Sequence, residues 1–295
     1  MLPRCDADAV LRLGGRAFPL GRPVLMAVVN RTPDSFYDRG QTYAFGAALD
    51  RVDQVVAEGA DIVDIGGVKA GRGDDIGVGE ELRRTQALVT AARQRHPKLV
   101  LSVDTWRAEV ADVLCSEGAD LVNDSWAGVH PNVAEVAAKH GAGLVCSHTG
   151  GLEPRTDPRL SSYDDVVADV IAGTTALATR AVEVGVRRDG ILIDPTHDFG
   201  KNTYHSLELT RRLDELVSTG WPVLVALSNK DFVGETLDLP IEERLHGTLA
   251  ATAVAAWHGA LVFRTHQVAE TRQVLDMVAS IRGERPPARP RRGLP

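Results

Sequence analysis

Eight short apolar runs, each followed by a longer segment with a helical pattern, constrain the fold of this chain more than any other feature. The runs contain Val, Leu and Ile without alternating polar residues, which is typical of strands buried on both faces of a parallel sheet. They cover Val24–Val29, Ile62–Ile65, Leu99–Val103, Leu121–Val122, Leu144–Cys146, Ile191–Ile193, Val223–Leu227 and Leu261–Phe263. Because eight successive βα units favour a closed sheet over an open one, the pattern predicts a barrel.

Amphipathic, alanine-rich segments supply the connections between these runs. Several of them end at a glycine, the residue that most readily terminates a helix. The predicted helices cover Phe45–Glu58, Ala108–Glu117, Val133–His140, Asp164–Val184, Leu207–Leu216 and Leu245–His258. The sequence therefore predicts an α/β fold, a (β/α)8 TIM barrel, with an N-terminal hairpin cap over Val10–Leu20 and a disordered C-terminal tail.

The chain of 295 residues is expected to form one barrel domain over residues 1–281. Barrels of about 250 residues fold as one unit, so the length does not require a second domain. The last segment, Arg282–Pro295, is rich in Pro and Arg and is expected to be a flexible tail.

Charge and cysteine content exclude several classes of protein. The net charge of −7 argues against nucleic-acid and membrane partners, which attract an excess of Lys and Arg. The three cysteines, Cys5, Cys115 and Cys146, form no CxxC pair, and the last two lie in apolar stretches typical of core residues. The N-terminus lacks the apolar stretch of a signal peptide, and no window approaches the roughly 20 apolar residues of a membrane helix. We therefore expect a cytoplasmic protein.

Polar residues stand where the predicted strands end. In barrels of this type the active site lies at the carboxyl ends of the strands, so these side chains are expected to converge on one mouth. Any one of them could instead be a helix cap or a satisfied core residue, but the whole set is unusual for a purely structural role. The set comprises Asn30, Asp64, Asp104, Asn123, Ser147, His148, Asp194, Ser228, Lys230, Arg264 and His266.

Two groups within this set suggest different ligand chemistry. Arg264 and His266 would face the same side of an extended segment and, with Asn30, could hold phosphate oxygens; a simple salt bridge is the alternative. The second group, Asp104, Asn123, Asp194 and Lys230, could pair with the edge of a flat heterocycle, with Phe199 as an apolar face. A turn at Asp194 and a helix cap at Asp104 are the structural alternatives.

Other chemistries find little support. The sequence has no Walker-type phosphate loop and no strand–GxGxxG–helix fingerprint. His148, His197 and His266 invite a metal-hydrolase interpretation, but the His-x-His pair expected after the first strand of such barrels is missing. We therefore do not expect a zinc site.

The motifs together resemble the dihydropteroate synthase family from about residue 20 to residue 280, and the chain looks like a divergent second paralogue. Eight segments match in order. They are Asn30–Phe36, Gly59–Gly67, Ser102–Thr105, Gly118–Asp124, Asp194–Pro195, Phe199–Lys201, Ser228–Lys230 and Arg264–His266.

This resemblance implies an activity and a set of roles. The family condenses 6-hydroxymethyl-dihydropterin pyrophosphate with p-aminobenzoate in folate biosynthesis and releases pyrophosphate. By resemblance Mg²⁺ binds near Asn30, pyrophosphate binds at Asn30, Arg264 and His266, p-aminobenzoate binds near Ser228, and the protein is a homodimer. The pterin would be held by Asp104, Asn123, Asp194, Phe199 and Lys230, and the catalytic group would be Asp104, Lys230, Arg264 and His266.

The sequence departs from the family pattern mainly around the second substrate. The loop after the second strand normally reads Glu-Ser-Thr-Arg-Pro-Gly, whereas this chain has Val68–Gly73, with Arg72 as a replacement arginine only if the loop is shifted by one residue. Thr196-His197-Asp198 stands where the family has small residues around two glycines, and could narrow the pterin site. Asn229 replaces an Arg, Arg31 a Val and Gln267 an Asp.

Three interpretations follow. The first is a homologue that keeps pterin affinity but whose dihydropteroate synthesis is weak or lost, because both substrates and exclusion of water are needed. The second is a working synthase with an altered loop. The third is another pterin-dependent transfer, such as methyl transfer to a corrinoid, and a noncatalytic pterin-binding protein is a further possibility.

Overall fold

Eight parallel strands form the barrel, and each pairs with the next strand along the chain. The computed structural model describes residues 10–32, 43–69, 76–126, 128–130, 132–154 and 162–292. The barrel strands are β3 (Val24–Asn30), β4 (Ile62–Gly66), β5 (Val100–Asp104), β6 (Leu121–Asp124), β7 (Gly143–Ser147), β8 (Ile191–Asp194), β9 (Leu224–Ala226) and β10 (Val262–Thr265). The predicted strands are thus confirmed, with ends displaced by no more than two residues.

The circle of strands closes at two seams. Strand β10 returns to β3 as a regular parallel pair, with Val262 opposite Val24. Between β8 and β9 the pairing is reduced to one bridge, Ile193 opposite Val223, with the amide of Ile193 donating to the Pro222 carbonyl at 2.9 Å. The barrel is therefore nearly closed, and β8–β9 is its weakest seam.

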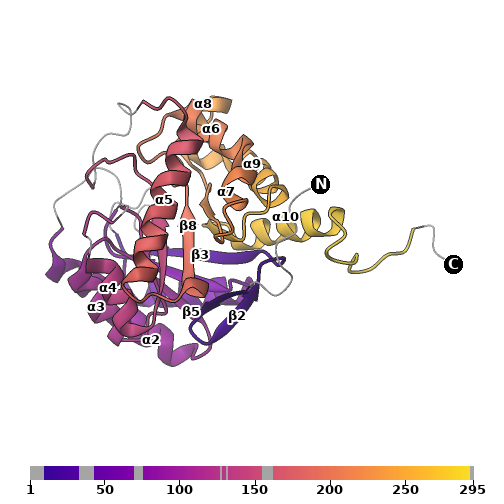
Figure 1. Ribbon diagram of the computed structural model, residues 1–295. Helices are drawn as coiled ribbons and strands as arrows, with labels where there is room; N and C mark the ends of the chain where they lie inside the picture. The colour runs from indigo at the N-terminus through magenta and orange to yellow at the C-terminus, as the bar shows by residue number, and fades with distance from the viewer. Residues whose placement is uncertain are drawn as a thin grey trace.

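Helices cover the outside of this barrel (Figure 1), and α5 packs along β7 and β8. Their bounds are α1 (Phe45–Ala57), α2 (Val78–Arg95), α3 (Ala108–Ser116), α4 (Asn132–His140), α5 (Val166–Glu183), α6 (Thr203–Arg211), α7 (Leu213–Val217), α8 (Asp231–Leu237), α9 (Leu245–Trp257) and α10 (Val268–Ile281). The prediction of one helix over Leu207–Leu216 is wrong, because the chain leaves helical geometry at Arg212, whose guanidinium bonds Asp165 at the start of α5.

Three of the described helices, α2, α8 and α10, were not given bounds from the sequence. Helix α2 escaped because its inner face carries the buried charged residues Glu81 and Arg84 in place of a continuous apolar stripe. Helix α8 is only seven residues long, too short to show a period.

The N-terminal hairpin closes the lower end of the barrel. Strands β1 (Val10–Leu13) and β2 (Arg16–Pro19) are antiparallel and meet at Gly14 and Gly15, whose positive φ values of 52° and 74° suit a tight two-residue turn. From the hairpin, Leu11, Leu13 and Phe18 join an apolar cluster inside the barrel. The cluster's other buried members are Val24, Met26, Ile62, Val100, Leu121, Val145, Leu192, Leu224, Leu261 and Val262. The predicted hairpin cap is confirmed.

The barrel interior changes character along each strand. Successive inward residues on one strand are two positions apart, so Ile62 is followed by Asp64, Val100 by Ser102, and Val262 by Arg264. The lower interior is thus apolar and the upper interior polar, which places the candidate site at the carboxyl ends of the strands.

After α10, residues 282–292 contain neither helix nor strand and extend away from the barrel (Figure 1). Arg282 donates to the carbonyls of Ala256 and Trp257, which fixes the start of this segment on α9.

Within the described ranges, no helix is both long enough and apolar enough to cross a membrane.

Candidate functional site

Asp64 lies at the centre of the upper barrel interior and is fully buried. It accepts hydrogen bonds from the Ser102 hydroxyl at 2.6 Å, the Asn123 amide nitrogen at 3.1 Å and the Arg264 Nε at 2.7 Å. A buried carboxylate is tolerated only when its lone pairs are satisfied in this way. The sequence marked Asp64 as a strand-end polar residue, but did not identify it as the residue that holds Arg264 and Asn123 together.

Asp104 shares Arg264 with Asp64. The Arg264 Nη2 donates to Asp104 at 2.8 Å, and the Ser125 hydroxyl donates to the other carboxylate oxygen at 2.8 Å. Burial raises the pKa of Asp104 to about 6, against the opposing effect of Arg264. The helix-cap alternative for Asp104 is wrong, since α3 begins after Arg107 and has no side-chain cap. Arg264 is therefore held from below by two carboxylates.

Asp194 and Lys230 lie on the opposite part of the mouth. One Asp194 oxygen accepts the Thr196 amide at 2.7 Å, so the turn alternative for this residue is correct in part. Burial raises the pKa of Asp194 to about 6. The Lys230 ammonium lies 4.3 Å from the centre of the Phe199 ring and donates no hydrogen bond to any described residue. Asp194 and Lys230 thus offer an acceptor and donors beside an aromatic face.

Asn30, Ser228 and His266 stand at the ends of adjoining strands. A Cβ at Gly66 would lie 2.8 Å from the Asn30 amide oxygen, so the glycine leaves the space that this side chain occupies. The Ser228 hydroxyl donates to the Gln267 side chain at 2.7 Å and accepts the His266 amide at 3.3 Å. Strands β3 and β10 pair directly, which brings Asn30 and His266 to the same sector of the mouth.

The segment Thr196-His197-Asp198 does not simply fill the site. His197 is buried against α6 and α8, where its Nε2 lies 3.1 Å from the Thr210 hydroxyl and its ring packs on Phe232. Burial lowers the pKa of His197 to about 3. Asp198 accepts the amide of Asp231 at 2.7 Å, at the start of α8. The expected added bulk is thus turned away, but the added charge stays close to Lys230.

Lys201 holds the same loop through hydrogen bonds to backbone carbonyls. It is almost fully buried and donates to the carbonyls of His148, Phe199 and Thr196 at 2.7, 2.9 and 3.3 Å. Burial lowers the pKa of Lys201 to about 7. Because its three ammonium hydrogens are matched to three carbonyls, Lys201 stabilises the conformation of the β8–α6 loop.

An aromatic cluster near Phe199 was missed by the sequence analysis. The Trp126 ring lies 5.4 Å from Phe199 and 6.3 Å from Trp106, with both pairs edge-on, and Val68 and Ile76 pack beside them. The indole nitrogen of Trp126 is buried and has no hydrogen-bond partner among the described residues. Both tryptophans follow a strand by two residues, a signal that was present in the sequence. Residues from four βα loops therefore meet beside the mouth.

Arg31 and Asn229 are two positions at which the sequence departs from the family pattern. Arg31 donates to the carbonyls of Tyr43 and Arg84, at 2.8–3.0 and 2.6 Å. Asn229 is buried with a φ of 55°, a conformation that asparagine tolerates well. Arg72 and Pro33–Phe36 lie outside the described residues.

Other candidates named from the sequence have structural partners. His148 pairs with Asp169 at 2.7 Å on α5, and burial lowers its pKa to about 4. Cys115 and Cys146 are buried free thiols, as predicted, and Cys5 lies outside the described residues. In the described part of the chain no three His, Cys, Asp or Glu side chains cluster as a metal site.

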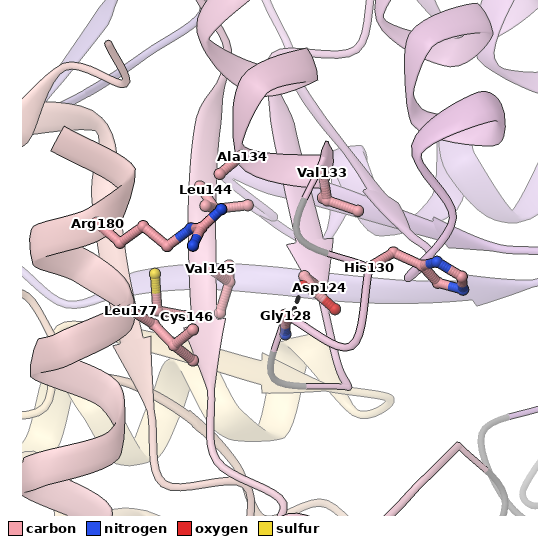
Figure 2. Close-up of a pocket in the computed structure, with 10 residues that line it drawn as sticks. All are labelled: Asp124, Gly128, His130, Val133, Ala134, Leu144, Val145, Cys146, Leu177 and Arg180. Atoms are coloured by element: carbon pink, nitrogen blue, oxygen red, sulfur yellow. Dashed lines mark hydrogen bonds between the residues drawn. The ribbon is translucent and has the colours of Figure 1, made fainter. Parts of the chain in front are cut away.

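A separate cavity of about 140 Å³ lies outside the barrel wall, among β6, β7, α4 and α5 (Figure 2). Asn123 and Asp124 are consecutive in β6, so Asn123 faces the barrel while Asp124 faces this cavity. The Asp124 carboxylate accepts the amides of Trp126 and Gly128 at 3.1 and 2.9 Å, and burial raises its pKa to about 6. Strand β6 therefore separates this cavity from the mouth.

Comparisons with known proteins agree with the sequence motifs. A family model described as pterin binding enzyme matches residues 26–266. Inactive dihydropteroate synthase 2 of Mycobacterium leprae is 58% identical over 286 residues, which cover 96% of this chain and 98% of that protein.

Solved structures of dihydropteroate synthases match the whole barrel. The Yersinia pestis enzyme with a sulfonamide drug has a TM-score of 0.88 at 34% identity, covering 94% of this chain and all of that one. The Xanthomonas albilineans enzyme in complex with 7,8-dihydropteroate has a TM-score of 0.81 at 35% identity, covering 92% of this chain and 98% of that one.

Proposed function

The chain belongs to the pterin-binding enzyme family as a homologue of dihydropteroate synthase, and we propose that it binds a pterin while forming little or no dihydropteroate. The observation that carries the proposal is a difference between two parts of the mouth in the polar groups that remain available for a ligand. Asp194 and Lys230 keep hydrogen-bonding capacity beside Phe199, whereas the Ser228 hydroxyl is engaged within the protein by Gln267 and the His266 amide.

The pterin is assigned to Asp104, Asn123, Asp194, Phe199 and Lys230. A pterin is flat and carries both donors and acceptors on its edges. Asp194 and the Asn123 amide oxygen accept hydrogen bonds, Lys230 donates to a ring carbonyl or nitrogen, and Phe199 covers an apolar face. Few polar groups around an apolar wall are what orient a small ligand in such pockets.

Pyrophosphate is assigned to Asn30, Arg264 and His266. Arg264 is fixed by Asp64 and Asp104, which hold the planar guanidinium in one orientation for phosphate oxygens. The Asn30 amide oxygen is a ligand of the kind that Mg²⁺ prefers, and the ion needs only one or two protein oxygens when phosphates and waters supply the rest. Bound there, the ion would neutralise charge on the departing pyrophosphate.

Four of these residues would act in the reaction itself: Asp104, Lys230, Arg264 and His266. Positive charge would develop on the pterin methylene as pyrophosphate leaves, and the Asp104 carboxylate would stabilise it. Arg264 and His266 would stabilise the leaving group, and Lys230 would hold the ring in place for the transfer.

Loss of the second substrate is what would stop this reaction. p-Aminobenzoate is assigned to Ser228, but that hydroxyl donates to Gln267. Asn229 and Arg31 bring no charge to the mouth, since one is buried in a turn and the other bonds backbone carbonyls. The 58% identical M. leprae relative is named inactive, which supports the same conclusion.

We also propose that the protein is a cytoplasmic homodimer. Helices α9 and α10 pack together and expose Val254, Trp257, Met277 and Ile281, an apolar surface that a second copy would cover. Light scattering should give twice the mass of 31.7 kDa, and Trp257→Lys with Met277→Lys should give the monomer. A wild-type monomer would contradict the proposal.

The test of function combines binding and turnover. Purified protein is titrated with 6-hydroxymethylpterin by calorimetry, then incubated with Mg²⁺, the dihydropterin pyrophosphate and p-aminobenzoate, and dihydropteroate is measured by chromatography. We expect binding without appreciable product, and loss of binding in Lys230→Ala but not in the exposed control Lys139→Ala. Robust turnover would mean a working synthase, and absence of pterin binding would reject the site.

A further inference from the structure

Two residues of the β8–α6 loop adopt a left-handed backbone conformation, which a threonine side chain disfavours. Thr196 has a φ of 53° and Asp198 a φ of 69°, both in the left-handed region. For a β-branched threonine this is a clear outlier, and such residues persist only where surrounding contacts impose them. The contacts around Asp198 show what this conformation achieves.

The Asp198 carboxylate is held between two helices. One oxygen accepts the amides of Asp231 and Phe232 at 2.7 and 3.4 Å, which caps the first turn of α8. The other accepts the Ser206 hydroxyl of α6 at 3.2 Å. The position of this negative charge is therefore fixed by three elements of structure: its own loop, α6 through Ser206, and α8 through two amides.

Lys230 is the residue immediately before α8, so this cap also places the carboxylate near its ammonium. Burial lowers the pKa of Lys230, and Asp198 is the group that opposes this most strongly. Five charged groups act on Lys230 from the surrounding elements. They are Asp194 on β8, Asp198 and Lys201 on the β8–α6 loop, Asp231 on α8 and Arg264 on β10.

On the premise of the proposed pterin site, we propose that Asp198 is a positioning residue that keeps Lys230 charged. The charged Lys230 then lets the mouth hold a neutral heterocycle through an acceptor atom of its ring. Without Asp198, Lys230 would lie in a partly buried site next to the cations Arg264 and Lys201, with only Asp194 and Asp231 left to oppose them. A neutral amine would be a poorer donor to a ring carbonyl. The added carboxylate also disfavours an anionic group at this point of the mouth.

Asp198→Asn tests this proposal because it removes only the charge. Asparagine adopts the left-handed conformation readily, and its side-chain oxygen can still accept the Asp231 amide. The chain has only five lysines, Lys69, Lys98, Lys139, Lys201 and Lys230, so ¹⁵N-lysine spectra can follow each ammonium, with Lys230→Arg for assignment. We expect the Lys230 titration midpoint to fall by about one pH unit or more in Asp198→Asn.

Ligand binding gives the second readout. Affinity for 6-hydroxymethylpterin, measured by calorimetry across pH, should decline at a lower pH in Asp198→Asn than in the wild type. In the window between the two midpoints the variant should bind about tenfold more weakly. Asp231→Asn is the matched control, because this exposed acid pairs with Arg244 and its backbone amide stays in place. It should shift the midpoint far less.

The two readouts separate this proposal from the proposed function. An unchanged Lys230 midpoint in Asp198→Asn, or an equal shift in Asp231→Asn, overturns the role of Asp198 whether or not pterin binds. If wild-type protein binds no pterin while the Lys230 midpoint still moves as expected, the electrostatic role stands and the pterin assignment fails.

Discussion

The lower and upper halves of the barrel interior are lined by the same strands but are stabilised in different ways. Below, the hairpin residues Leu11, Leu13 and Phe18 complete an apolar cluster, so packing alone fills the space. Above, Asp64, Asp104 and Arg264 form a hydrogen-bonded ionic network around the mouth. Two residues along one strand are enough to pass from the first region to the second.

This difference separates stability from function within one core. Apolar burial is favourable wherever the shapes fit, and it requires no particular partner. A buried charge is tolerated only with its partner in place, so the upper half contributes little net stability but fixes the directions of its donors and acceptors. We therefore expect substitutions in the two halves to differ in kind: lower ones should change stability alone, and upper ones should change stability and ligand binding together.

Removing Arg264 should have the largest effect. In Arg264→Met, Asp64 remains fully buried without its cation, and the free energy of unfolding should fall by about 3–5 kcal/mol. Urea denaturation at pH 7 measures this loss. Adding Asp64→Asn to Arg264→Met should restore much of the stability but not pterin binding. A loss below about 1 kcal/mol in the single variant would mean that the network does not depend on this pairing.

A lower-half substitution should be nearly as costly without affecting the ligand. Leu13→Ala removes a buried side chain from the barrel floor and should lower the free energy of unfolding by about 2–5 kcal/mol. Calorimetric affinity for 6-hydroxymethylpterin, measured where the variant is folded, should not change. The neighbouring exposed Arg12→Ala should alter stability by no more than about 0.5 kcal/mol. A pterin affinity that fell in Leu13→Ala would show that the halves are coupled.

The apolar half was also the half that the sequence described well. Strand runs such as Ile62–Ile65 and the Gly14-Gly15 turn are local patterns, and local patterns suffice for strands buried on both faces. Helix α2 was missed because Glu81 and Arg84 lie on its buried face. Glu81 pairs there with Arg107, an interaction that no helical period can reveal.

In the polar half the sequence identified members of the mouth but not their partners. Asp104, Asp194 and Lys230 were recognised as strand-end residues. That Asp64 would bond Arg264 could not be derived, because the two residues are 200 positions apart and meet only across the closed barrel. The position of Asp198 against α8 likewise depends on how two loops pack.

Asp194 is a residue of the mouth whose buried negative charge should lower the free energy of unfolding. Its pKa of about 6 in the folded protein lies above its ordinary value of 3.8 because burial disfavours the charge. Its contribution to stability is thus present below about pH 4 and is lost as pH rises through 6. Asp194→Asn should therefore be more stable than the wild type by about 1–3 kcal/mol at pH 8, and less so at pH 4.

The measurement is urea denaturation of both proteins between pH 4 and pH 8. Asp50→Asn, at an exposed position of α1, is the control and should follow the wild type. Pterin affinity should fall at least tenfold in Asp194→Asn, because the amide cannot replace a carboxylate as a double acceptor. A stability difference that stays constant with pH would mean that burial does not penalise the Asp194 charge.

The smallest expected effect is at the rim of the network. Ser125→Ala removes the 2.8 Å hydrogen bond to Asp104, and the free energy of unfolding should fall by only about 0.5–1.5 kcal/mol. Since that hydrogen bond favours the charged carboxylate, its loss should raise the pKa of Asp104 further. Carboxylate ¹³C spectra would detect this shift, with Ser116→Ala on the exposed end of α3 as the control. The contrary outcome is an Asp104 titration that stays unchanged in Ser125→Ala. The upper half would then tolerate the loss of one contact as readily as the lower half tolerates a small change in packing. In that case the contrast between the two regions would be narrower than the ionic network suggests.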